Sequence, residues 1–132
     1  MSKLYNVHIG AGVVAFLSGE LKSGIQSILD LVEFEKLLQD ADLVITGEGK
    51  IDEQSVRGKV ISGIAERAQK MHVPVLVVVG AIGEGANLAC DLGVSAIFSI
   101  NQAPIPFEIA RHESKKNLTA TIDNLMRFKK TF

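Results

Sequence analysis

The sequence predicts an α/β fold in which one parallel β-sheet is covered by helices on both faces. Three short apolar runs, at 43–45, 75–79 and 96–100, have the length and composition of strands buried in a parallel sheet. Segments with apolar residues at helical spacing separate these runs and follow the last one. Strands that alternate with helices in this way form βαβ units. We therefore expect a Rossmann-like sheet in a single domain of residues 1–132.

The helices are predicted from the spacing of apolar residues. Ile25, Ile28 and Leu29 begin the i, i+3, i+4, i+7 pattern of an amphipathic helix. Gly93 is well placed to end the helix before the third strand. The segments with this pattern are 25–32, 34–41, 60–71, 87–92 and a long helix after Pro106, and the apolar run 13–17 is expected to be helical or packed against the core.

The composition excludes several classes of protein. The net charge is −1, with 14 basic and 15 acidic side chains, no basic patch and no Trp, so we expect no nucleic-acid partner. No apolar run approaches the ~18 residues of a membrane span, so we expect no membrane partner. The single cysteine, Cys90, cannot form an internal disulfide, which favours the cytoplasm, and we expect its thiol to be buried.

The segment that follows the first predicted strand carries the candidate chemistry. Residues 46–55 are expected to form a glycine-rich loop at the carboxyl end of the strand, where open parallel sheets bind ligands. Glu48 and Asp52 could hold a cation or activate a hydroxyl, and the next helix offers its positive end to phosphate. Asp52 or Ser55 could instead simply cap that helix. The residue types alone leave both interpretations open.

A second glycine-rich segment, residues 80–85, follows the second predicted strand. Its order is G-x-x-G-x-G, whereas a dinucleotide fingerprint reads G-x-G-x-x-G, and no acidic residue ends the next strand to hold a ribose. It also lacks the Lys-Ser/Thr pair of a P-loop. We expect a turn that lines the same cleft as residues 46–55.

Residues 40–55 read D-A-D-L-V-I-T-G-E-G-K-I-D-E-Q-S. This run resembles the signature D-A-D-L-V-I-T-G-E-G-[RK]-I-D-x-Q-[TS] of the bacterial glycerate kinase family. The run E-L-K-S-G-I at 20–25 and the run 94–100 are similar to flanking segments of that family, so the resemblance covers nearly the whole chain. The sequence departs from the usual pattern at Ser55, Arg57 and Ile61, where Thr, His and Pro are common.

The resemblance implies that the chain is the C-terminal third of a glycerate kinase and one lobe of a two-lobe kinase. The implied reaction is the ATP-dependent phosphorylation of glycerate to phosphoglycerate, with Mg²⁺. The implied catalytic residues are Asp52 and Glu48. The residues implied to bind substrate or nucleotide are Thr46, Gly47, Gly49, Lys50, Gln54 and Lys59.

The resemblance also implies what the chain lacks. Kinases of this family are much longer, and nothing here corresponds to the Asp-x-Phe-Lys-Gly-Ser-like segment near their N-terminus. We therefore expect no catalysis by the isolated chain, and a partner that is either the missing N-terminal kinase segments or a second copy. Two alternatives are a non-catalytic module that binds a nucleotide or an organic acid, and an assembly fragment.

Overall fold

A computed structural model describes residues 14, 16–18, 22–57 and 60–131. Within these residues the sheet has three parallel strands in the order β1-β2-β3. The strands are β1 Val44–Ile51, β2 Val75–Ile82 and β3 Ala96–Ser99. The predicted α/β class and the three strand positions are confirmed, but β1 and β2 run further toward their carboxyl ends than the sequence suggested.

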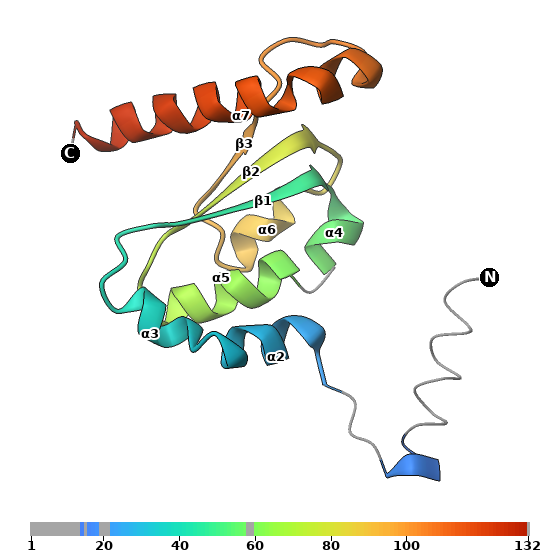
Figure 1. The fold of residues 1–132 in the computed structure, drawn as a ribbon, viewed down its shortest axis with the longest axis vertical. Helices are drawn as coiled ribbons and strands as arrows, with labels where there is room; N and C mark the ends of the chain where they lie inside the picture. The colour runs from blue at the N-terminus through green and yellow to red at the C-terminus, as the bar shows by residue number, and fades with distance from the viewer. Residues whose placement is uncertain (1–13, 15, 19–21, 58–59, 132) are drawn as a thin grey trace.

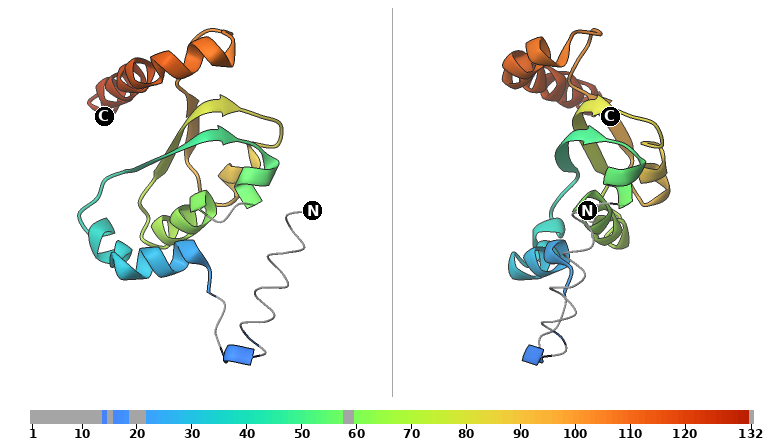
Figure 2. Two further views of the ribbon diagram at one scale, coloured as in Figure 1. Left: turned by 45° about the vertical axis from the view of Figure 1, so that its right-hand side comes forward. Right: turned by 90° about the vertical axis from the view of Figure 1, so that its right-hand side faces the viewer.

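The helices lie on both faces of this sheet, as predicted. Both crossover connections, which carry α4, α5 and α6, run under one face, and α7 crosses the other (Figure 1). Two further helices, α2 and α3, lie outside α5, and Figure 2 shows the same layers from two other sides. The bounds are α2 Gly24–Leu31, α3 Phe34–Leu38, α4 Glu53–Arg57, α5 Val60–Lys70, α6 Leu88–Asp91 and α7 Phe107–Lys129. None of the described helices is long and apolar enough to cross a bilayer.

The expectation that residues 46–55 form a loop is wrong for residues 46–51, which belong to β1. They pair with β2 from Val44 opposite Val75 through Ile51 opposite Ile82. The same holds for residues 80–82, which continue β2, so only residues 83–85 of the second glycine-rich segment form a turn. Most of these glycines therefore lie in paired strands, and few of them lie in a turn.

The core lies between the sheet and α5. Val75, Val77 and Val79 of β2 are fully buried, and Ala65 and Ala68 of α5 lie against them with no exposed surface. The two-residue period of a strand puts these three valines on one face, and Val78 on the opposite face of β2 is buried as well. The small alanine side chains let α5 approach the sheet closely, which excludes water from the apolar face.

The run 13–17 was expected to be helical or packed against the core, and its described residues Val14, Phe16 and Leu17 are helical and exposed. The expectation that the Cys90 thiol is buried is wrong, because Cys90 is exposed. The short helix α6 turns Ala89 inward, and the neighbouring Cys90 therefore faces solvent.

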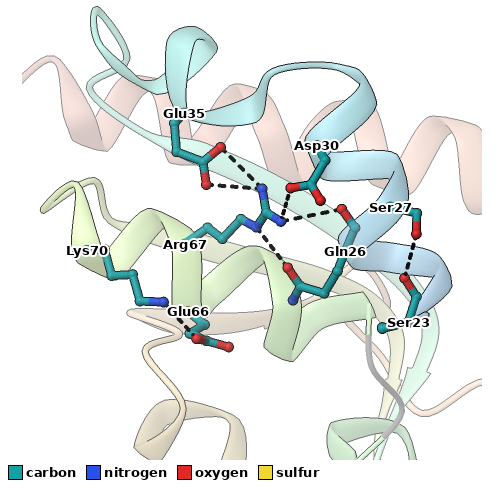
Figure 3. A network of polar contacts seen from close by, with 8 residues as sticks. All are labelled: Ser23, Gln26, Ser27, Asp30, Glu35, Glu66, Arg67 and Lys70. Atoms are coloured by element: carbon teal, nitrogen blue, oxygen red, sulfur yellow. Dashed lines mark hydrogen bonds and ion pairs between the residues drawn. The ribbon is translucent and has the colours of Figure 1, made fainter. Parts of the chain in front are cut away.

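The outer helices are attached to α5 through the guanidinium of Arg67, whose side chain is only 13% exposed (Figure 3). Its Nε donates to Gln26 Oε1 at 2.8 Å, and its Nη2 donates to Asp30 and to the carbonyl oxygen of Gln26. Its Nη1 donates to both carboxylate oxygens of Glu35, at 3.1 and 3.2 Å. Hydrogen bonding to Asp30 is the main cause that raises the pKa of Arg67 above its ordinary value. A single side chain thus joins α2, α3 and α5.

We expect Arg67→Met to lower the melting temperature. The substitution keeps an apolar stem of similar length but removes every donor, so the carboxylates of Asp30 and Glu35 lose their shared cation. Lys70→Met is the control, because Lys70 lies on the same helix and, within the described residues, forms its ion pair with the exposed Glu66. Thermal unfolding followed by circular dichroism measures both, and equal melting temperatures for the two variants would contradict a joining role for Arg67.

Candidate functional site

A groove runs between α7 and the sheet, and we call it the α7 groove. Its apolar section has a volume of about 530 Å³ and its cationic section about 680 Å³. The two sections share the lining residues Glu48, Gly49, Gly80 and Ile100. The apolar section is lined further by Ile45, Thr46, Gly47, Val78, Val79, Leu118 and Ile122, and the cationic section by Lys50, Ala81, Asn101, Ile105, Ala110, Arg111 and Ser114.

Polar contacts hold α7 over the sheet and so define the groove. Near the C-terminal end of α7, Lys129 Nζ lies 3.0 Å from Asp42 Oδ2, just before β1. In the middle of the helix, Asn117 Nδ2 donates to Asn101 Oδ1 at 3.4 Å. Asn101 in turn donates to the carbonyl oxygen of Gly80 at 2.7 Å, which ties the end of β3 to β2. The cationic section therefore opens at the carboxyl ends of all three strands, where ligands of parallel sheets bind.

Glu48 borders both sections of the groove and is half-buried. The register pairs it with Val79, so strand alternation directs its side chain to the face that carries the core valines, opposite α7, and Glu48 borders the groove from the edge of the sheet. In the described part of the chain no strand pairs with the other side of β1, and Glu48 therefore stands at the uncovered edge of the sheet. Its carboxylate has no hydrogen-bond or ion-pair partner among the described residues, which leaves it available to a ligand.

Asp52 sits directly before α4 and caps it. Its Oδ1 accepts hydrogen bonds from the backbone N–H groups of Gln54 at 3.1 Å and Ser55 at 3.0 Å. Ser55 Oγ accepts from the Asp52 N–H at 2.6 Å, which completes a reciprocal cap. Oδ2 lies 2.9 Å from Lys50 Nζ. Hydrogen bonds from Lys50 and then from the Ser55 N–H lower the pKa of Asp52 to about 2.

These hydrogen bonds show that Asp52 and Ser55 cap α4, which was one of the two interpretations left open by the sequence. Asp52 does not line the α7 groove, but it holds the ammonium of Lys50, which does. Glu48 and Asp52 are therefore not two carboxylates of one cluster. A catalytic role for Asp52 remains a prediction, since capping and catalysis are not mutually exclusive.

Some of the other predicted residues line the groove, and others do not. Thr46, Gly47, Gly49 and Lys50 all line the groove. Gln54 is exposed on α4, outside the groove. Lys59 lies outside the described residues.

The sequence reasoning missed Arg111 as a groove residue. Arg111 lines the groove from α7, about sixty residues after β1, and no local motif marks it. Its position at the groove depends on how α7 is placed over the sheet.

The residues fit a Mg²⁺ ion only in part. Among the described residues no three or more His, Cys, Asp or Glu side chains gather into a metal site. Mg²⁺ bound with phosphates usually takes only one or two protein carboxylates and completes its shell with phosphate oxygens and water. Glu48 alone could supply one such ligand.

Residues 8–130 match the glycerate kinase family, which is nearly the whole chain. The chain belongs to this family of kinases. It is 40% identical over 117 residues to a glycerate kinase of Bacillus cereus, covering 89% of this chain and 31% of that protein. It is 42% identical over 92 residues to the glycerate 2-kinase of Escherichia coli K12, covering 70% of this chain and 24% of the relative.

A solved structure supports the same assignment. A crystal structure described as that of a glycerate kinase 2 from Salmonella typhimurium LT2 aligns with a TM-score of 0.69 and 34% identity. The alignment covers 92% of this chain and 31% of the solved one. The chain thus spans less than a third of the length of these glycerate kinases.

The cap at Asp52 predicts how the stability of this chain responds to acid. Its folded pKa lies below the ordinary value of 3.8, so the ionised carboxylate stabilises the fold above about pH 4. That contribution should disappear as the pH falls from about 4 toward 2. Asp52→Asn, which can still cap, lacks the charge that Lys50 and the helix end favour. We expect the variant to melt below the wild type at pH 7, and the two melting curves to converge toward pH 2. A gap that stays constant over this range would contradict the assignment.

Proposed function

We propose that this chain forms the C-terminal part of a glycerate kinase and transfers phosphate only together with the rest of the enzyme. In the proposed reaction a hydroxyl oxygen of glycerate bonds to the γ-phosphorus of ATP, the bond to ADP breaks, and the hydroxyl proton passes to a base. The observation that carries this proposal is the unpaired, half-buried carboxylate of Glu48 at the free edge of β1, on a residue that borders the groove. The cytoplasm is the compartment we propose for it.

The geometry favours different roles for the two carboxylates. Glu48 is free to accept the hydroxyl proton or to hold Mg²⁺ beside the phosphates, and we propose it as the carboxylate that meets the substrates. Asp52 has both oxygens engaged, by the α4 cap and by Lys50. We propose Asp52 as a positioning residue that keeps the Lys50 ammonium at the groove.

A chimaera tests the proposed function directly. Residues 8–130 would replace the matching segment of the Bacillus cereus glycerate kinase, and ATP-dependent phosphorylation of glycerate would be measured by a coupled assay. We expect turnover by the chimaera and none by the 132-residue chain alone, because less than a third of the relative's length is present. Glu48→Gln in the chimaera should lower kcat by at least ~10²-fold, the lower scale for general-base or electrostatic groups.

Two comparisons make this result decisive. Glu66→Gln, on the exposed side of α5, should leave kcat unchanged. If Asp52→Asn lowered kcat as much as Glu48→Gln does, Asp52 would have the catalytic role that the sequence predicted. A chimaera that melts cooperatively but has no turnover would count against the kinase proposal and favour a non-catalytic binding module.

We also propose that the free edge of β1 recruits a partner, which is a second copy when the chain is alone. An unpaired edge presents backbone donors and acceptors that another strand can satisfy. Ile45 adds apolar surface to this edge strand, with 40% of it exposed. Light scattering over a range of protein concentrations should show a mass above that of the 14.2 kDa monomer. A monomer at every concentration would contradict self-association.

A further inference from the structure

We propose that the α7 groove is the nucleotide site of this segment, with Arg111 and Lys50 holding the phosphates and Leu118 covering the base. The proposal rests on the kinase function proposed above and names where this chain holds its phosphoryl donor. It adds α7 residues to a site that the sequence placed entirely on and after β1.

The two sections of the groove match the two chemical ends of a nucleoside triphosphate. The apolar section brings Ile45 and Val78 of the sheet opposite Leu118 and Ile122 of α7, which suits a flat base. The adjoining section carries the charged side chains. Each section has a volume within the range of small-molecule sites, which are concave and mostly apolar with a few polar groups at defined places.

The cationic section presents two positive groups from opposite walls. Lys50 comes from β1 and Arg111 from α7. Each is held by a neighbouring acid in an ion pair of 2.9 Å, Lys50 by Asp52 and Arg111 by Glu108. Both cations are more than half exposed, so these pairs are weak and can exchange with an incoming phosphate. An Arg guanidinium also matches phosphate oxygens with two parallel donors.

Gly49 supplies an independent observation. A Cβ at Gly80 would lie 2.7 Å from the Gly49 carbonyl oxygen, which requires glycine there, and a Cβ at Gly47 would be crowded at 3.1 Å from the Val78 carbonyl oxygen. A Cβ at Gly49 would meet nothing within 4 Å, and its φ is not in the left-handed region. Glycine weakens a strand interior, and it often marks a bulge or the close approach of a ligand or of another backbone. Gly49 lines both sections of the groove, where a side chain would occupy the space of the ligand.

The test measures binding to the 132-residue chain by isothermal titration calorimetry in magnesium chloride. The three probes are ATP, inorganic tripolyphosphate and glycerate. We expect ATP to bind more tightly than tripolyphosphate, because only ATP reaches the apolar section. Arg111→Gln should weaken the binding of both polyphosphates by about tenfold, the scale of a lost hydrogen bond to a charged group. Gly49→Ala should also weaken the binding of both, because its methyl group would occupy space that the ligand needs. Leu118→Ala should weaken ATP by roughly three- to tenfold and leave tripolyphosphate unchanged.

Two of the three variants have a matched control variant, and for Leu118→Ala the control is the binding of tripolyphosphate. Arg127 lies on α7 in the same kind of ion pair, with Asp123 at 2.8 Å, but does not line the groove, so Arg127→Gln should bind as the wild type does. Gly24→Ala, at the start of α2, also adds a methyl group to open space, away from the groove. Melting temperatures within about 3 °C of the wild type would show that all five variants are folded.

The outcomes separate this proposal from the kinase function, since no turnover enters the measurement. If Arg111→Gln bound ATP as tightly as the wild type, Arg111 would not hold the phosphates. If Leu118→Ala bound ATP as tightly as the wild type, Leu118 would not cover the base. Binding of glycerate without binding of tripolyphosphate would assign the two cations to a carboxylate and overturn the nucleotide site. A chain that binds no probe would overturn the proposal even if the chimaera were active.

Discussion

The pairing of β1 with β2 from one end to the other is the contact on which the candidate site depends. It joins Val44 to Val75 at one end and Ile51 to Ile82 at the other. Toward the carboxyl end, the two strands approach so closely that Gly80 could not carry a Cβ beside the Gly49 carbonyl oxygen. Because glycine removes this clash, a polar segment continues as strand until it reaches the sheet's carboxyl edge. The positions of Glu48 and Lys50 are therefore fixed by the backbone ladder.

The same pairing fixes the turn that follows. The Gly83 N–H donates to the carbonyl oxygen of Ile51 at 2.7 Å, and the Glu53 N–H donates to the backbone carbonyl oxygen of Glu84 at 3.0 Å. Asp52 is held between these two bonds, and its carboxylate meets the free N–H groups at the start of α4. The strand ladder, the cap and the Lys50 ion pair thus form one connected set of contacts. A change at Asp52 reaches the groove through Lys50, without a direct contact between Asp52 and the ligand.

The parts of this fold that the sequence predicted are those set by local pattern. Apolar runs and helical spacing located all three strands and every described helix of more than five residues, since burial on one face imposes a period that is visible in the chain. The end of β1 was not predicted, because a glycine-rich run suits a turn as well as a close strand pair, and the choice lies with β2. The exposure of Cys90 and the groove wall at Arg111 also depend on how helices sit on the sheet. The Asp52 cap was foreseen as one of two alternatives, because capping is a local event between Asp52 and the next three residues.

The α7 groove follows from two features that act together. Polar contacts at Lys129 and Asn117 hold α7 above the sheet, so the helix does not close onto it. Beneath the helix, the β1 positions that would otherwise fill the gap are Gly47 and Gly49. A Cβ at Gly47 would be crowded by β2, whereas a Cβ at position 49 would meet nothing within 4 Å. A strand that gives up a side chain without a steric need loses some stability of its own. That loss of stability is understandable if a ligand fills the empty volume during function. A substitution at Gly49 can therefore separate an effect on binding from an effect on folding.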